Sequence, residues 1–364
     1  MSVGFLPTAL AILSLGYLVS RGFIFKIAKI CESRGYLDAP GERKLQKQPV
    51  PYGGGFVVLL GWLFWALVIG LGHVAGVWAK LWPEHELLPQ KLVHSNTAWA
   101  IGFGLISMLG LGCVDDIYTL RPRVKLGFQT IVVVVVLWCG DLGMSFFWNW
   151  PILGFVVSLL WVLLITNAFN LIDNMDGYCS SVALIALAVH VILCEIHGHH
   201  LVALAALMSM GPLLAFAQQN WPPAKLYLGD AGSLSLGFFM AMLSIASTYY
   251  HSGQSLTSFL TPILILAIPL FDVGTVMWIR FRLKEPLFKG DRRHFSHRLL
   301  ALGCSLNQAL LVITGISLIT GLAAICVNLG DERIAIFILL QIMVVLGLVV
   351  VLERAGQKRW EQKD

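Results

Sequence analysis

Long apolar runs alternate with short polar segments along the chain, a pattern typical of a protein that crosses a membrane many times. A helix needs about 20 mostly apolar residues to cross a bilayer. By this criterion we predict eleven spanning helices, at residues 4–25, 52–79, 96–114, 126–141, 151–169, 178–196, 201–219, 233–250, 259–279, 305–328 and 334–353. The polar segments are too short to hold a soluble domain. The sequence therefore predicts one all-α integral membrane domain over residues 1–364.

The composition supports the same fold class. Of the 364 residues, 57% are hydrophobic and 12% are charged, and the mean hydropathy is +0.79. An ordinary soluble domain is about 25% charged. So little polar surface cannot cover such an apolar interior, which excludes a soluble protein, and we expect no nucleic-acid partner. The seven cysteines form no C-x-x-C pair, and we expect them to be small apolar residues.

Lysine and arginine positions predict the orientation, because cytoplasmic loops of membrane proteins carry an excess of both. If the N-terminus lies outside, 22 of these residues fall on the inside, counting Arg21 at the inner end of the first helix, and only Lys80, Lys91 and Arg333 fall outside. The inside segments are 26–51, 115–125, 170–177, 220–232, 280–303 and the tail 354–364. We therefore predict an outside N-terminus and a cytoplasmic C-terminus.

Acidic and amide side chains gather on these inside loops. They are Asp115, Asp116, Asn170, Asp173, Asp176 and Asp230. Charged groups at the mouths of apolar helices are costly unless they are paired or hydrated, so this gathering predicts a site. Two alternatives stay open, namely a solvated helix end at Asp115 and Asp116 and a helix N-cap at Asp230. Carboxylate and amide oxygens are the ligands that Mg²⁺ prefers.

Cationic groups and glycines provide candidates for binding an anion. The loop 280–303 contains Arg292, Arg293, His294, His297 and Arg298, which suit either lipid headgroups or a pyrophosphate. Gly54 and Gly55 enter the second predicted helix, where a glycine-rich turn can bind anions, although no P-loop lysine follows. Acids for a metal and cations for phosphates, at a membrane interface, favour phosphoryl-type chemistry between a nucleotide and a lipid.

Six blocks in one order carry a family resemblance: PVPYGGG, GCVDDIYTLRPRVKLGFQ, NAFNLIDNMDG, LYLGDAGSLSLG, PLFD and GDRRHFSHRLLALG. The set resembles the polyprenyl-phosphate N-acetylhexosamine-1-phosphate transferases of glycosyltransferase family 4. The resemblance implies transfer of a sugar 1-phosphate from a UDP-N-acetylhexosamine to undecaprenyl or another polyprenyl phosphate, with release of UMP. It also implies a Mg²⁺ or Mn²⁺ cofactor, a cytoplasmic active site in the bacterial inner membrane, and a role in starting a cell-envelope polysaccharide. A homodimer is left open.

The last block separates branches of this family. The run His294-Phe295-Ser296-His297 is closer to the N-acetylglucosamine-1-phosphate branch. The phospho-N-acetylmuramoyl-pentapeptide transferases, which remain the alternative, have three consecutive histidines. Ser296 departs from the usual H-x-H-H pattern, and Asn174 and Tyr178 replace a typical glycine and leucine.

The resemblance further implies residue roles. Asp230 and Asn170 would hold the metal, and Asp115 and Asp116 would lie at the lipid phosphate. Asp173 and Asp176 would assist the metal and the uridine. The remaining candidates are Lys47 and Lys125 as active-site cations, and Arg292, Arg293, His294, His297, Gly54 and Gly55 as substrate-binding residues.

A phosphate monoester is largely dianionic at neutral pH, so we expect one in-line displacement at the β-phosphorus, positioned by Asp115 or Asp116. An aspartyl-phosphate intermediate is the rival mechanism. A secondary transporter with Asp272 as its coupling site is the alternative from another class. A CDP-alcohol phosphotransferase is a further one, but Ser180 and Ser181 stand where that family has alanine and arginine.

Overall fold

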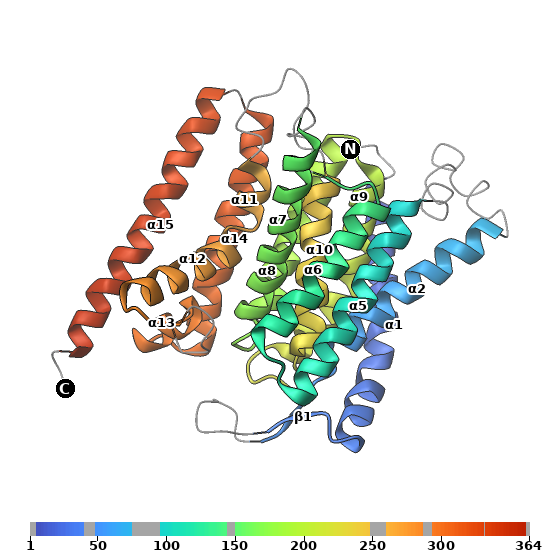
Figure 1. Ribbon diagram of the computed structural model, residues 1–364, viewed down its shortest axis with the longest axis horizontal. Coiled ribbons are helices and arrows are strands. Elements are labelled where there is room, and N and C mark those ends of the chain that lie inside the picture. The colour runs from blue at the N-terminus through green and yellow to red at the C-terminus, as the bar shows by residue number, and fades with distance from the viewer. Residues whose placement is uncertain are drawn as a thin grey trace.

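Long helices run between the two ends of the molecule in the computed structural model (Figure 1). The structure describes residues 5–39, 48–74, 95–143, 150–247, 260–286, 293–330 and 332–361. The long helices are α1 (Phe5–Ser33), α2 (Gly54–Val74), α5 (Asn96–Tyr118), α6 (Pro122–Cys139), α7 (Pro151–Ile172), α8 (Tyr178–Ile196), α9 (His200–Asn220), α10 (Gly229–Ala246), α14 (Leu306–Leu329) and α15 (Glu332–Glu361). Each of them contains a stretch long and apolar enough to cross a membrane. The chain is a multi-pass membrane protein.

The observed helices follow the predicted spans closely, with one break. The predicted span 178–196 coincides with α8, whereas α1 continues eight residues past the predicted end at residue 25. The predicted span 259–279 is divided into α11 (Thr261–Ile265) and α12 (Ala267–Arg282). Pro269 explains the break, because proline has no amide hydrogen to donate to Ile265 and its ring crowds that carbonyl. The described residues thus contain ten unbroken helices of spanning length instead of eleven.

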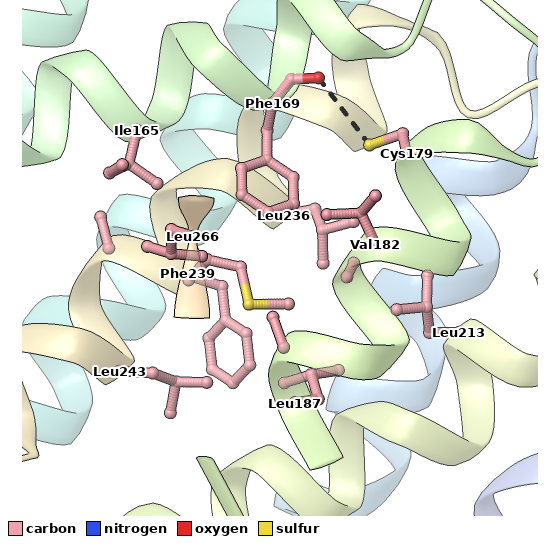
Figure 2. Packing of buried hydrophobic residues seen from close by; sticks show 14 of the residues in the cluster. Ile165, Phe169, Cys179, Val182, Leu187, Leu213, Leu236, Phe239, Leu243 and Leu266 are labelled. Atoms are coloured by element: carbon pink, nitrogen blue, oxygen red, sulfur yellow. Dashed lines mark hydrogen bonds between the residues drawn. The ribbon is translucent and has the colours of Figure 1, made fainter. Parts of the chain in front are cut away.

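Helix α10 lies at the centre of the bundle, where it packs against α2, α5, α7 and α8. Nearly all of its residues are buried. Its first turns are rich in glycine, alanine and serine, which allow helices in a membrane to approach closely. Figure 2 shows the core around it, in which Leu236 and Phe239 of α10 meet Phe169 of α7 and Leu187 of α8.

A small hairpin adds β-structure to the expected all-helical fold. Strands β1 (Leu37–Asp38) and β2 (Val50–Pro51) pair antiparallel at the lower end of the bundle in Figure 1. The amide of Tyr227 donates to the carbonyl of Pro51 at 2.9 Å, and Tyr52 forms a parallel bridge to Tyr227. The segments that precede α2 and α10 are therefore tied together.

The predicted orientation of the chain in the membrane, with the N-terminus outside and the C-terminus in the cytoplasm, stays a prediction.

Candidate active site

The site is built where α5 and α10 touch through their backbones. A Cβ on Gly112 of α5 would lie 2.3 Å from the Cα of Ala231 in α10. No flexible side chain separates the two helices at this point, so only glycine permits the approach. Because Asp115 and Asp116 follow Gly112 by one turn, and Asp230 precedes Ala231, the contact places three carboxylates side by side.

Asp116 holds the start of α10. Its carboxylate accepts hydrogen bonds from the amides of Asp230 (2.8 Å) and Ala231 (3.2 Å) and from the hydroxyl of Tyr36 (2.5 Å). The preceding residue, Gly229, has a φ of 71°, a conformation that a side chain would strain. The N-cap alternative for Asp230 is wrong, because the N-cap position is Leu228 and no side chain from α10 caps it. A residue of α5 performs this task instead.

Lys125 of α6 connects three other helices. Its ammonium nitrogen lies 2.6 Å from Asp115 Oδ2, 2.7 Å from Asp230 Oδ2 and 2.9 Å from Asn170 Oδ1. The amide nitrogen of Asn170 in turn donates to Asp230 Oδ1 at 2.8 Å. Asp115 is buried and also accepts the Leu120 amide at 2.6 Å, so it is not a solvated helix end. One cation, two carboxylates and one amide from α5, α6, α7 and α10 form a single network.

Asp173 and Asp176 lie in the loop between α7 and α8 and have different surroundings. Asp176 accepts a hydrogen bond from the Ala224 amide at 2.9 Å, although burial still raises its pKa above the ordinary value. Among the described residues, no donor forms a hydrogen bond to the carboxylate of Asp173. Burial, followed by repulsion from Asp230, Asp116 and Asp176, raises the pKa of Asp173 well above its usual range. This carboxylate lacks a positive partner within the described residues.

Two residues of the basic loop, Arg293 and His294, contact acidic side chains of the protein. The two terminal guanidinium nitrogens of Arg293 donate to the carboxylate of Glu285, at 2.8 and 2.9 Å. His294 is buried, with Nδ1 2.9 Å from Asp272 Oδ2, and the amide of Phe295 donates to the other oxygen of Asp272 at 2.5 Å. These contacts hold Arg293 and His294 against the protein, and their contact with a diphosphate stays a prediction.

Asp272 belongs to α12, and its carboxylate contacts His294 and Phe295. It is fully buried and anchors α13 (Phe295–Ala301) to α12. A transporter's coupling carboxylate needs access to an ion pathway, and a carboxylate whose two oxygens bind His294 and the Phe295 amide does not offer it. The structure therefore gives Asp272 an anchoring task.

Loops and helix ends line an open cavity of about 830 Å³. Its acidic lining residues are Glu32, Asp38, Asp116, Asp173, Asp176 and Asp230. The basic side chains that line it are Lys225 and His297. Negative charge thus prevails in the part of the cavity wall that the structure describes, and an anionic substrate can enter only with cations that offset this charge.

Gly54 and Gly55 serve helix packing. The amides of Gly54 and Gly55 donate to the carbonyls of Tyr227 and Leu228 at 2.9 and 3.2 Å, so they have no free hydrogen for an anion. A Cβ on Gly55 would lie 2.6 Å from the amide nitrogen of Gly232. The expectation of an anion site at these amides is therefore wrong. Two further candidates, Lys47 and Arg292, lie outside the described residues.

Three tyrosines of the site were not predicted from the sequence: Tyr52 and Tyr227 line the cavity, and Tyr36 contacts its lining residue Asp116. Tyr36 binds Asp116, Tyr52 donates to Asp38 at 2.5 Å, and the rings of Tyr36 and Tyr52 lie 5.5 Å apart. Burial, followed by nearby carboxylates, raises the pKa of Tyr36, Tyr52 and Tyr227 above the ordinary value, so all three remain hydrogen-bond donors at neutral pH. The one sequence signal is their position beside polar motifs instead of inside apolar runs.

Comparisons with known proteins cover the same elements. The family model of glycosyl transferase family 4 matches residues 98–248, which include Asp115, Asn170 and Asp230. A probable undecaprenyl-phosphate N-acetylglucosaminyl 1-phosphate transferase of Bacillus subtilis (strain 168) is 30% identical over 95% of this chain and 90% of its own length. The undecaprenyl-phosphate alpha-N-acetylglucosaminyl 1-phosphate transferases of Escherichia coli (strain K12) and Yersinia pestis are 24% and 26% identical, each over 82% of this chain and 78% of their own length.

Proposed function

We propose that this chain, which belongs to glycosyl transferase family 4, transfers N-acetylglucosamine 1-phosphate from UDP-N-acetylglucosamine to undecaprenyl phosphate and releases UMP. The names of its relatives support the acceptor and the sugar. The observation that supports a transferase most directly is the convergence of Asp115, Asn170, Asp230 and Lys125 from four helices beside one acidic cavity.

The proposed reaction joins two anions, so its main difficulty is charge repulsion. The acceptor phosphate is largely dianionic at neutral pH and needs no general base. Lys125 supplies a fixed positive charge in contact with Asp115 and Asp230. Preorganised charge of this kind stabilises a transition state without reorganisation during the reaction.

The contacts of the paired aspartates favour a single in-line displacement. A carboxylate has about four acceptor positions. Asp116 uses three of them for Tyr36 and the two α10 amides, and Asp115 binds Lys125 and the Leu120 amide. Carboxylates committed in this way are poor nucleophiles, so we propose that they position groups and do not form an aspartyl-phosphate.

We propose Mg²⁺ as the cofactor, held by Asp230 and Asn170, with Asp173 close by. The chemistry of the donors fits, because Mg²⁺ prefers oxygen ligands. The described residues contain no ready-made cluster of three or more metal-binding His, Cys, Asp or Glu side chains. The carboxylate of Asp173, which lacks a described hydrogen-bond donor, supports the need for a cation at this place. When bound, such an ion would neutralise diphosphate charge and stabilise the leaving UMP.

We propose that the site faces the cytoplasm at the inner membrane of a bacterium. The excess of lysine and arginine on the segments predicted to lie on the same side as the acids supports this orientation. The apolar helices supply the lipid-facing surface that an enzyme with a polyprenyl acceptor needs.

A purified-enzyme assay tests the function. The enzyme in detergent receives undecaprenyl phosphate and one of UDP-N-acetylglucosamine, UDP-N-acetylgalactosamine or UDP-N-acetylmuramoyl-pentapeptide, with EDTA, Mg²⁺ or Mn²⁺. We expect lipid-linked N-acetylglucosamine and UMP with Mg²⁺, and no product with EDTA. Product from the pentapeptide substrate alone would assign the other branch. The enzyme is also incubated with labelled UDP-sugar in the absence of lipid. Release of UMP together with transfer of the label to the protein would refute the single displacement.

A further inference from the structure

Two positions at which the chain departs from its family's pattern lie in direct contact. The hydroxyl of Ser296 donates to Oδ1 of Asn174 at 2.5 Å, across 122 residues of sequence. The amide nitrogen of Asn174 donates to the carbonyl of Leu171 at 2.6 Å, which fixes the orientation of the side chain. Ser296 is fully buried. A buried hydroxyl that loses its partner carries a full desolvation penalty, so this contact constrains both segments.

The contact joins two walls of the cavity. Asn174 lines the cavity between Asp173 and Asp176, in the loop from α7 to α8. Ser296 immediately precedes His297, which lines the cavity from α13. The rest of α13 is anchored to α12, since Asp272 binds His294 and the Phe295 amide. The Asn174–Ser296 hydrogen bond therefore links the helix that carries His297 to the loop that carries the two aspartates.

We propose that Asn174 and Ser296 act as one positioning pair, which fixes His297 relative to Asp173 and Asp176 around the nucleotide sugar. Neither side chain is a catalytic residue, because each acts through its sequence neighbours. The proposal rests on the proposed function for its substrate. Among the described residues, no hydrogen bond joins the pair to Lys125 or Asp230, whose contacts are with Asp115, Asn170 and Asp116. The pair thus controls the binding of the donor more than the chemical step.

A double-mutant cycle tests the pair. We expect Asn174→Ala and Ser296→Ala each to raise KM for the nucleotide sugar about tenfold, with kcat within about twofold of the wild type. The double variant should also show a rise of about tenfold, instead of the roughly hundredfold rise expected for independent residues. Ser317→Ala is the matched control, because this buried serine donates only within α14, to Ile313 at 2.9 Å. It should leave KM unchanged.

Independent effects on KM, a loss confined to kcat, or an equal KM rise in Ser317→Ala would each overturn the pairing. A second cycle avoids the buried serine, because Asn174 is partly exposed and its variant perturbs only a loop. His297→Ala should raise KM much less in the Asn174→Ala background than in the wild type. Wild-type transfer to undecaprenyl phosphate, measured first, tests the proposed function alone. If the wild type is inactive, the first cycle is read on the thermal unfolding midpoint, where additive shifts would refute the pair.

Discussion

Replacing Gly112 by alanine tests whether backbone contact between α5 and α10 holds the acidic site together. The new Cβ would lie 2.3 Å from both the Cα and the amide nitrogen of Ala231 and 2.4 Å from the carbonyl carbon of Asp230. Ordinary van der Waals contact begins near 3.4 Å. Since every atom in the way belongs to the backbone, no side-chain rotation relieves the clash, and the helices must separate by about 1 Å.

A separation of that size breaks the contacts that position Asp230. The hydrogen bond from the Asp230 amide to Asp116 is 2.8 Å long and would exceed the limit of a normal hydrogen bond. Lys125 contacts Asp230 of α10 at 2.7 Å and Asp115 of α5 at 2.6 Å. When the two helices separate, at least one of these two contacts must lengthen. A misplacement of about 1 Å costs on the order of 100-fold in rate. Overpacking of a well-filled core costs about 1–3 kcal/mol in stability.

The assay measures the initial rate of sugar-phosphate transfer at saturating substrates, together with thermal unfolding. Gly110→Ala is the matched control, because Gly110 belongs to the same helix, is exposed, and has no atom within 4 Å of a new Cβ. We expect the control to keep the wild-type rate and Gly112→Ala to lose about 100-fold. If Gly112→Ala stays within about threefold of the control, the backbone contact does not position the site and the geometric reasoning is refuted.

Three further substitutions probe separate parts of the site. Tyr36→Phe removes one hydrogen bond to Asp116 and should lower kcat about tenfold, whereas Tyr17→Phe, which only loses a bond to Gln218, should not; equal rates would contradict a positioning role for Tyr36. Asp173→Asn should abolish transfer but raise the unfolding midpoint in EDTA by about 2–4 °C at pH 8 and less at pH 5. The sign follows from the raised pKa of Asp173 in the folded protein. As the pH rises above the unfolded pKa of about 4, the unfolded chain loses this proton more readily than the folded one, so the wild type loses stability while the asparagine variant does not. A difference in midpoint that is independent of pH would contradict this reasoning. Asp272→Ala leaves buried His294 and the Phe295 amide without their acceptor and should destabilise the protein by about 3 kcal/mol, measured by chemical unfolding; an unchanged midpoint would show that α13 is anchored elsewhere.

The helices and the meeting of the acids could be predicted from the sequence for simple reasons. A spanning helix can be recognised in the sequence as a run of about 20 mostly apolar residues. Acids at the inner mouths of several spans must lie at one face, and the network of Asp115, Asn170 and Asp230 confirms that these side chains are neighbours. The break before α12 also has a visible cause in Pro269.

Side-chain partners could not be predicted, because apolar periodicity loses its meaning in lipid. In a soluble helix the apolar face marks the core, but here the lipid-facing side is equally apolar. The sequence therefore cannot say that Gly112 faces Ala231 while Gly110 faces outward. For the same reason the sequence showed a cluster of five basic residues at positions 292–298 without showing that Glu285 binds Arg293 and Asp272 binds His294.

The adjacent aspartates at the end of α5 illustrate why the motif needs two carboxylates. Successive residues on a helix point about 100° apart, so Asp115 and Asp116 cannot face the same group. Asp115 faces Lys125, and Asp116 faces the amides that begin α10. One aspartate holds the cation of the site, and the other fixes the helix that brings Asp230 to that cation. Because each arrangement depends on the other, removal of either carboxylate should displace Lys125 relative to Asp230, even though only Asp115 touches the lysine.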